Sequence, residues 1–382
     1  MLTENELKWQ ALAQEFADSV LERDRAGLEQ PGAARRLMPE LGAAGLIGTL
    51  LPAEYGGAGL SLVHNTVIQE VLSGSAPSLA AMRAVSAVFV PVPLMQFGTD
   101  AQKARWLPGI AAGESTSAIA FTEPDAGSDL GGMTTTATPA TSGYTLNGHK
   151  WYISGSTEAD FILVYAVTAP DAPIESRLSA FLVPTSLPGV DAATGIETMG
   201  MRGLSHAQVR FRDVHLSRDD LLGEIGQGYE IVNYGLAPER IDIAARAVGC
   251  AHRAYREALR YAGQRRQFGR PIRKFQAVSH RLADMCTTVS ASRLLVLQAA
   301  RQFDAGEPCQ REAAMAKLHA ANEGFKVCDD AMQILGALGY TKEIYPVELL
   351  FRDIRVLRMG GGTDEIMRHI IQREEYLALG EL

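Results

Sequence analysis

The sequence predicts a mixed α+β protein in which a helical block, a strand block and a second helical block follow one another. Three observations carry this prediction. Apolar residues recur at helical spacing up to about residue 117, β-branched and aromatic runs fill 118–225, and the helical spacing returns in 226–382. Like elements gathered in blocks favour separate helical and sheet layers over a doubly wound nucleotide-binding sheet. We therefore expect domains at 1–117, 118–225 and 226–382.

The first block begins with an amphipathic pattern. Trp9, Leu12, Ala13 and Phe16 fall on one face of a helix, and "AARRLMPELGAAGLIG" repeats the spacing further along the chain. Glycine and proline in "LPAEYGGAGL" then predict a loop. The pattern indicates an all-helical N-terminal domain.

The middle block contains runs typical of strands, and the last block contains long helical stripes. The strand runs are "YTLNGHKWYIS", "FILVYAV", "LSAFLVP" and "AQVRFRDVHL". The Asn147–Gly148 pair is predicted to be the turn that leads into the first strand, with Trp151 and Tyr152 on its opposite faces. A stripe from Ile241 to Ala262 and the segment "AVSHRLADMCTTVSASRLLVLQAARQFDAG" predict two long helices.

Composition and charge argue against several classes of function. The formal net charge is −8, whereas a non-specific binder of nucleic acid or anionic membrane needs a basic face. No run is expected to reach the ~20 apolar residues of a membrane span, and the acidic first segment lacks the basic region of a secretory signal. The four cysteines have no CxxC spacing, so they are expected to be buried and to form neither a disulfide framework nor a metal site. We expect a cytoplasmic protein that binds no nucleic acid, membrane or metal.

Four short stretches carry residues suited to chemistry. "AFTEPDAGSDLGGMTTTA" offers hydroxyls and backbone N–H groups for a phosphate or a planar ring, although a plain surface loop has the same composition. "QRRQFGRPI" gathers three arginines, either as a solvated turn or as a clamp on a diphosphate. "APERI" places Glu239 and Arg240 beside Pro238, at the first turn of a helix or at a kink within one. "RMGGGTDEI" has three consecutive glycines, which let the backbone approach a ligand closely.

In order along nearly the whole chain, six segments resemble the acyl-CoA dehydrogenase family. They are "EYGGAGLS", "AFTEPDAGSDLGG", "LNGHKWYISG", "RRQFGRPIRKFQAV", "MQILGALGYTKEIYPVELLFRDIRV" and "GGTDEIMRHIIQRE". The resemblance implies an N-terminal helical domain, a middle β-domain that is barrel-like or a sandwich, and a C-terminal four-helix bundle. It also implies FAD bound at the subunit interface of a homotetramer or dimer.

The resemblance assigns the FAD contacts to this chain residue by residue. Contacts to the flavin ring come mainly from the middle block, and contacts to the diphosphate and adenosine come from the last block. The implied set is Ile119, Thr122, Ser128, Tyr152, Ile153, Ser154, Arg265, Gln267, Phe268, Gln276, Gln333, Gly336, Thr363 and Glu365.

The resemblance also identifies a candidate base. Many family members carry the catalytic glutamate immediately before the Gly-Thr of the tail, where this chain has Gly361. A branch similar to isovaleryl-CoA and long-chain acyl-CoA dehydrogenases places it on a C-terminal helix before an arginine, which matches Glu239 before Arg240. Glu239 would then take the α-proton, and the Gly361 N–H would hold the enolate. Ser128, Arg240, Gly361 and Gly362 are the expected substrate contacts, and the missing side chain at Gly361 is predicted to leave room for a branched or bulky acyl group.

The reaction implied by the resemblance is FAD-dependent α,β-dehydrogenation of an acyl thioester, with an electron-transferring flavoprotein as acceptor. A flavin monooxygenase or oxidase on the same fold and a non-catalytic binding protein are the alternatives, and Glu239 and the FAD motifs argue against them. Leu204, His206 and Ala237 depart from residues common in the family, so coenzyme A and an acyl carrier protein both stay open as the carrier. His206 itself is expected to be a strand-edge residue.

Overall fold

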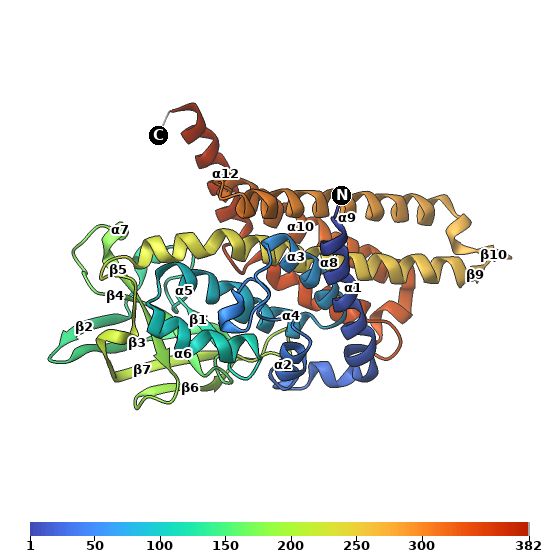
Figure 1. Cartoon of the computed structure of the whole chain (residues 1–382). Helices are drawn as coiled ribbons and strands as arrows, with labels where there is room; N and C mark the ends of the chain where they lie inside the picture. Colours follow the sequence, from blue (N-terminus) through green and yellow to red (C-terminus); the bar gives the residue numbers. More distant parts are fainter. Residues whose placement is uncertain (381–382) are drawn as a thin grey trace.

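The structure is a computed structural model that describes residues 1–380, and it is built from three blocks (Figure 1). The sheet lies at one end of the molecule, and the long helices of the last block run from the sheet toward the opposite end (Figure 1). The order of helices, strands and helices confirms the predicted mixed α+β fold.

The first block is helical, as expected. Its helices are α1 (Glu4–Phe16), α2 (Ala33–Ala43), α3 (Leu62–Ser75), α4 (Pro77–Ala84), α5 (Pro91–Phe97) and α6 (Asp100–Ala111). Capping boxes begin α1 and α6: the Thr3 and Thr99 side chains accept from the backbone N–H three residues on, and Glu6 and Gln102 reach back. These side chains fix where the two helices start.

The middle block is one eight-stranded mixed sheet. Its elements are β1 (Ser117–Ala120), β2 (Thr136–Ala140), β3 (Gly143–Ser154), β4 (Phe161–Val167), the short α7 (Ile174–Arg177), β5 (Leu178–Pro184), β6 (Val190–Gly195), β7 (His206–Leu216) and β8 (Leu221–Leu222). The strand order is β6-β7-β3-β2-β4-β5-β8, and β1 pairs with β4 in parallel. All seven residues of β4 are buried, because the sheet is covered on both faces there.

The Asn147–Gly148 pair does not form the predicted turn; it lies inside β3. The register of β3 against β7 shifts between Leu146 and Gly148, which marks a β-bulge. A Cβ at Gly148 would collide with the Thr135 side chain, so glycine allows the chain before β2 to approach the strand closely. Close packing therefore outweighs the turn preference of this pair.

The last block is dominated by long helices. They are α8 (Gly228–Gln264), α9 (Gln276–Asp304), α10 (Gln310–Leu335), α11 (Val347–Ile354) and α12 (Asp364–Leu379), with the hairpin strands β9 (Arg266–Gln267) and β10 (Arg270–Pro271) between α8 and α9. The α10 helix packs against α8, α9 and α12. Pro238 lies inside α8, which excludes the alternative that it begins the helix.

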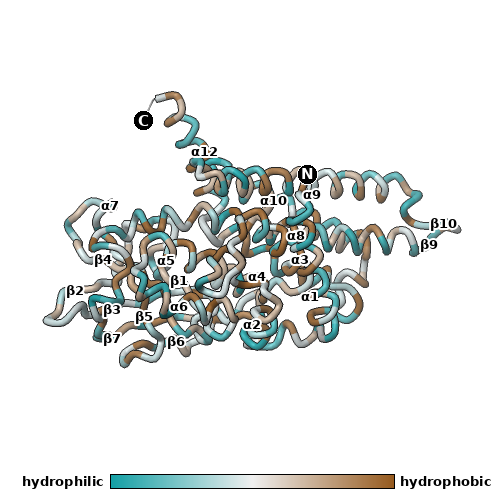
Figure 2. The backbone as a smooth tube through the Cα atoms, viewed as in Figure 1, coloured by the Kyte–Doolittle hydropathy of each residue, from teal (hydrophilic) through white to brown (hydrophobic). Residues whose placement is uncertain are grey.

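Two large apolar cores hold these blocks together, and a third, small cluster joins α10 to α12. The larger one joins the N-terminal helices to α8, α9 and α10 and to one face of the sheet, while the smaller one lies on the other sheet face. Alternate residues of β4 enter the two cores, Leu163 and Tyr165 the larger and Ile162 and Val164 the smaller. Hydrophobic and hydrophilic segments accordingly alternate along the backbone (Figure 2).

Two expectations about apolar residues were wrong in part. Within residues 1–380, Pro77–Phe97 is long and apolar enough to span a membrane, but 89% of its apolar window is buried inside the protein, as in a core helix. Cys250, Cys309 and Cys328 are buried, whereas Cys286 is exposed on α9; all four are free thiols.

Candidate active site

Glu239 lies on α8 with its carboxylate buried. The residue is 5% exposed, and burial raises its pKa to about 7 against the opposing charges of Arg240 and Arg246. Nothing among residues 1–380 donates a hydrogen bond to this carboxylate or pairs with it as a salt bridge. A buried carboxylate whose lone pairs are unused and whose pKa lies near 7 is suited to accept a proton at neutral pH.

Three other buried carboxyl groups of the described chain also have raised pKa values, but each is bound within the protein. Glu70 pairs with Arg293 at 2.8 Å. Asp242 accepts hydrogen bonds from two amide side chains and pairs with an arginine. Asp353 accepts from a backbone N–H at 2.6 Å. Each of these carboxyl groups has at least one oxygen bound by a donor within the protein, whereas no donor binds either oxygen of Glu239 among residues 1–380, so Glu239 is the better candidate for a base.

Gly361 lies directly beside this carboxylate. A Cβ built on Gly361 would be 3.6 Å from Glu239 Oε1 and 2.6 Å from Ile243 Cδ1. The two positions at which the family resemblance could place a base therefore lie together, one on α8 and one on the loop before α12. The end of the Ile243 side chain lies in the space next to the Gly361 Cα, and the expectation that Gly361 leaves room for a bulky acyl group stays a prediction.

Two cationic side chains bind backbone carbonyls of the glycine loop. Arg240 Nε donates to the Gly361 carbonyl at 3.2 Å, and Lys317 Nζ donates to the Gly362 carbonyl at 2.6 Å. In the described part of the chain, the Gly361 N–H has no hydrogen-bond partner. Since the carbonyls are tied to Arg240 and Lys317, this N–H is left as a donor for a negatively charged oxygen.

Sequence reasoning missed Lys317. It is fully buried on α10, and burial lowers its pKa to about 8. A buried lysine is rare unless something pairs with it, but its neighbours "AMAKLHA" look like an ordinary helix. Only its position on a helix face otherwise made of small apolar residues could have drawn attention to it.

A strained turn in β3 exposes the aromatic side chain expected beside the flavin. The register shifts between Lys150 and Ile153, and Tyr152 has a φ of 58° with its side chain 57% exposed. A non-glycine residue in this conformation is costly and is common at functional sites. The Trp151 N–H donates to the Thr122 carbonyl at 2.9 Å, which joins the turn to the hydroxyl-rich segment. Thr122, Tyr152 and Ser154 are thus brought together on one part of the sheet.

A buried ion pair anchors the hydroxyl-rich segment. Lys150 Nζ lies 2.8 Å from Glu123 Oε1, and the other Glu123 oxygen accepts from the Thr134 N–H and hydroxyl. Burial alone would raise the pKa of Glu123, but Lys150 and the threonines hold it at about 2. Ser128 lies between Glu123 and Thr134, which these contacts hold in place, and is itself exposed.

The residues expected at the diphosphate lie at the opposite end of α8. Arg265, Gln267 and Phe268 belong to the hairpin, where Phe268 is 92% exposed and has a φ of 50°. At 1.5 Å of rise per residue, Arg265 is roughly 39 Å along the helix from Glu239. Figure 1 shows the hairpin strands β9 and β10 far from β3. One protomer therefore does not bring its two sets of expected FAD residues together.

The other expected cofactor contacts differ in exposure. Gln276, Gln333, Gly336 and Glu365 are exposed. Ile119 packs at the edge of the larger core and Ile153 is buried in the smaller one, so only the Ile153 backbone can face a ligand. The Thr363 hydroxyl accepts from the Ile366 N–H and caps α12.

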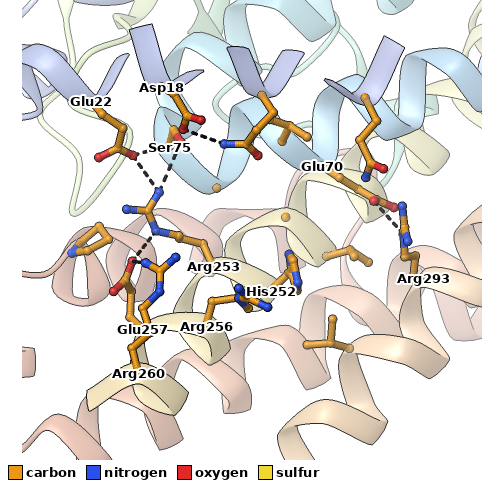
Figure 3. Close-up of a pocket in the computed structure, with 18 of the residues that line it drawn as sticks. Asp18, Glu22, Glu70, Ser75, His252, Arg253, Arg256, Glu257, Arg260 and Arg293 are labelled. Carbon is orange, nitrogen blue, oxygen red and sulfur yellow. Dashed lines mark hydrogen bonds and ion pairs between the residues drawn. The ribbon is translucent and has the colours of Figure 1, made fainter. Parts of the chain in front are cut away.

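A separate cleft of about 990 Å³ lies between α1, α3, α8 and α9 (Figure 3). Basic side chains of α8, namely His252, Arg253, Arg256 and Arg260, point into it (Figure 3). None of the expected catalytic or cofactor residues lines this cleft. Its size alone does not make it the active site.

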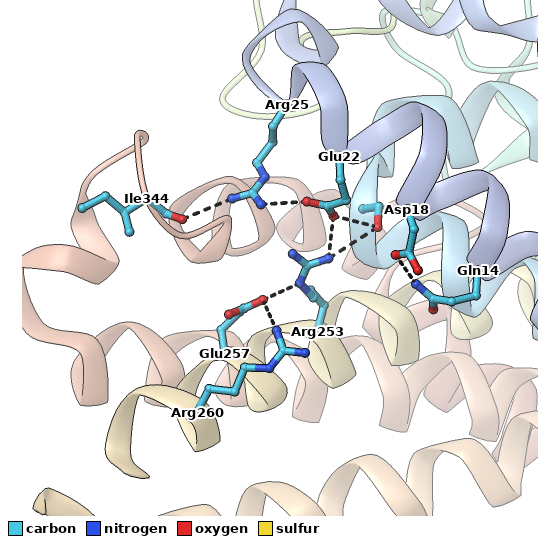
Figure 4. A network of polar contacts seen from close by, with 9 residues as sticks. Gln14, Asp18, Glu22, Arg25, Arg253, Glu257, Arg260 and Ile344 are labelled. Carbon is cyan, nitrogen blue, oxygen red and sulfur yellow. Dashed lines mark hydrogen bonds and ion pairs between the residues drawn. The ribbon is translucent and has the colours of Figure 1, made fainter. Parts of the chain in front are cut away.

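Most charges in this cleft are paired with one another. Glu22 lies 2.7 Å from both Arg25 and Arg253, and Arg253 also lies 2.7 Å from Glu257 (Figure 4). Burial would raise the pKa of Glu22, but the two arginines hold it at about 2. The network joins the segment after α1 to α8, and we interpret its role as stabilising the fold.

Three family models cover almost the whole chain. They are the acyl-CoA dehydrogenase N-terminal domain at residues 3–114, the middle domain at 118–214 and the C-terminal domain at 226–375.

Individual proteins agree with these models. "Probable acyl-CoA dehydrogenase YngJ" of Bacillus subtilis (strain 168) is 35% identical over 98% of both chains. The solved "FAD complex of PigA" has a TM-score of 0.93 at 28% identity, covering 100% of this chain and 99% of PigA. The solved "Prolyl Acyl Carrier Protein Oxidase AnaB" has a TM-score of 0.92 at 28% identity, covering 98% of this chain and 100% of AnaB. On its sequence, its fold and the place of its buried glutamate, the chain belongs to the acyl-CoA dehydrogenase family.

Proposed function

We propose that this flavoprotein oxidises the Cα–Cβ bond of an acyl thioester, with Glu239 as the base. Bound FAD supplies the acceptor for the hydride that leaves Cβ. Glu239 takes the α-proton onto a carboxylate oxygen, and the product is the α,β-unsaturated thioester. Two hydrogens leave the substrate, one as a proton and one as a hydride, so the step balances.

The observation that carries the proposal is the contact between the Glu239 carboxylate and the glycine loop. Gly361 lies beside the Glu239 carboxylate, and in the proposal one thioester presents its α-hydrogen to the carboxylate and its oxygen to the Gly361 N–H. As the proton leaves, negative charge grows on that oxygen, and the donor stabilises it. Arg240 and Lys317 keep the loop in place through its carbonyls.

The side chains of the middle block fit FAD. A flat ring needs an apolar or aromatic face and hydroxyl donors at its edge, and Tyr152, Thr122 and Ser154 provide these at the strained turn. In the hairpin, Arg265 and Gln267 would bind the diphosphate and Phe268 the adenosine part. The acceptor atoms of a diphosphate suit guanidinium donors better than any other part of FAD.

The separation of these two sets supports a homo-oligomer in which the hairpin of one protomer completes the FAD site of another. A phenylalanine exposed to 92% at a strained φ is expensive to keep in water. Contact with a partner's cofactor would remove that cost. We propose a tetramer or dimer on this ground.

Carrier, electron acceptor and compartment are further parts of the proposal. An electron-transferring flavoprotein is the acceptor that the family resemblance implies. Four free thiols suit the reducing cytoplasm. Similarity to AnaB over the full length of that protein supports an acyl carrier protein thioester, with oxygen as acceptor, as the second candidate.

Anaerobic bleaching of the bound flavin tests the proposal. The purified protein is mixed with isobutyryl-, isovaleryl-, glutaryl- and long straight-chain CoA thioesters and with the matching acyl carrier protein thioesters. Rapid bleaching by a CoA thioester supports the first candidate. Bleaching by carrier-protein thioesters alone supports the second, and no bleaching by any thioester contradicts the function.

A further inference from the structure

A histidine and a serine form a pair at the strand end beside the proposed flavin site. Ser154 ends β3 and His206 begins β7, and the two residues are direct partners across the antiparallel ladder. Partners in such a ladder point to the same face of the sheet. The distance from Ser154 Oγ to His206 Nδ1 is 3.1 Å, which is a hydrogen bond.

The other imidazole nitrogen has no partner. His206 Nε2 is buried and makes no hydrogen bond within residues 1–380. Burial lowers the pKa of His206, so the ring is neutral at physiological pH. A buried ring nitrogen without a partner is uncommon in a merely structural histidine, because it loses its bond to water and gains none in return.

The pair is held rigidly next to the strained turn. The Gly155 N–H donates to the Ser205 carbonyl at 2.8 Å, and the Ser205 hydroxyl binds Glu158. The Ile196 N–H donates to the His206 carbonyl at 2.6 Å. The backbone at and beside both residues is thus tied by hydrogen bonds, while the serine hydroxyl and the imidazole proton can still change direction.

We infer that His206 is a positioning residue that sets the direction of the Ser154 hydroxyl toward the flavin. The inference rests on the proposed function, in which Ser154 flanks the flavin ring. The sequence predicted a strand-edge residue at this position, and that role alone requires neither the 3.1 Å bond to Ser154 nor a buried Nε2.

The chemistry follows from the two neutral forms of imidazole. With the proton on Nδ1, His206 donates to Ser154 Oγ and the serine hydrogen is directed outward as a donor. With the proton on Nε2, Nδ1 accepts the serine hydrogen and the outward side of Oγ becomes an acceptor. Oxidised and reduced flavin differ in the hydrogen-bond donors and acceptors at their ring edge. One tautomer of His206 can therefore suit the oxidised flavin and the other the reduced flavin.

A double-mutant cycle on the FAD-loaded protein tests this inference. The midpoint potential of the bound flavin and its absorption spectrum are measured for wild type, His206→Phe, Ser154→Ala and the double variant. Loss of one hydrogen bond should change the ratio of affinities for oxidised and reduced FAD roughly fivefold, which is about 20 mV for a two-electron couple. Because His206 acts through Ser154, His206→Phe should add nothing once Ser154 is alanine.

Each outcome decides something. The inference is overturned if His206→Phe shifts the midpoint potential equally with and without the Ser154 hydroxyl, or does not shift it at all. Ser154→Ala separately reports whether Ser154 lies at the flavin. If Ser154→Ala itself changes neither potential nor spectrum, the placement of Ser154 beside the flavin fails as well. His206→Gln, which keeps a polar side chain of similar length, replaces His206→Phe if the latter does not fold.

The same sheet offers a matched control. His215 Nε2 lies 3.0 Å from Ser142 Oγ at an exposed position of β7. His215→Phe should leave potential and spectrum unchanged. The ¹⁵N shifts of His206, assigned by their loss in His206→Gln, should also change between oxidised and reduced protein, while those of His215 should not.

Discussion

The two ends of α8 differ in how they are completed. Around Glu239 the helix is buried, and the base, the loop N–H and the two cations behind the loop all come from one protomer. Around Phe268 the chain is exposed, and the Phe268 ring meets the ring of Phe275, at the start of α9, edge-on. The residues proposed for proton transfer are therefore fixed in a closed interior, whereas the residues proposed to bind the cofactor are exposed and, in our proposal, complete the site of another protomer.

The largest effect is expected at the buried end. Glu239→Gln keeps the volume but cannot accept a proton, so substrate should reduce the flavin ~10²- to 10⁴-fold more slowly, with FAD content unchanged. Stopped-flow absorbance measures the rate. Glu230→Gln, an exposed position near the start of α8, is the control and should behave as wild type.

Moving the carboxylate to Gly361 should not restore the rate. The double variant Glu239→Gln with Gly361→Glu places a side chain at a φ of 66° and against Ile243. Recovery of more than a few per cent of the wild-type rate of flavin reduction would show that the glycine loop can rearrange. The surroundings of Glu239 would then be less rigid than we infer.

The next largest effect is expected at the hairpin. Arg265→Ala with Phe268→Ala should weaken FAD binding roughly tenfold to a hundredfold, since charged hydrogen bonds to a diphosphate and an aromatic contact are lost. Dialysis against FAD-free buffer and the remaining flavin absorbance measure retention. Stoichiometric FAD after dialysis would contradict the proposal that Arg265 and Phe268 bind the cofactor. Arg273→Ala, exposed just beyond the hairpin, serves as control.

A smaller effect is expected from the cation behind the loop. Lys317→Met removes the donor to the Gly362 carbonyl and should slow flavin reduction roughly tenfold, the loss of one charged hydrogen bond. Lys317 also lowers the pKa of Glu239, so the pH at which the rate is half-maximal should move upward. A slower rate with an unmoved pH profile would mean that Lys317 only stabilises the fold. Lys326→Met, exposed on the same helix, controls for charge.

The smallest effect is the pH dependence of the wild type. Glu239 must be ionised to act as a base, and its pKa is about 7. The rate of flavin reduction should therefore fall about fourfold from pH 8 to pH 6.5. A rate that does not change over this interval would contradict a base of that pKa.

The sequence predicted the buried end in part, and the assignment of cofactor contacts to the hairpin stays a prediction. The order of elements and the motif containing Glu239 could be recognised from periodicity and resemblance. Lys317 could not, because its role depends on α10 packing behind a loop 45 residues further on, which no local pattern records. The bulge at Gly148 and the filled space at Gly361 were missed for the same physical reason. Each is decided by a side chain from another segment, Thr135 in one case and Ile243 in the other.

The most direct test of a divided site is complementation between two inactive variants. Glu239→Gln and the double variant Arg265→Ala, Phe268→Ala are co-expressed with different tags, and molecules that carry both tags are purified. In such a mixed pair one site joins an intact Glu239 to an intact hairpin, while the other site carries both defects. We expect flavin reduction to return to about half of the wild-type level, and the FAD content to lie between those of the two parents. A mixed species no more active than its parents, or the failure of any molecule to carry both tags, would contradict the account.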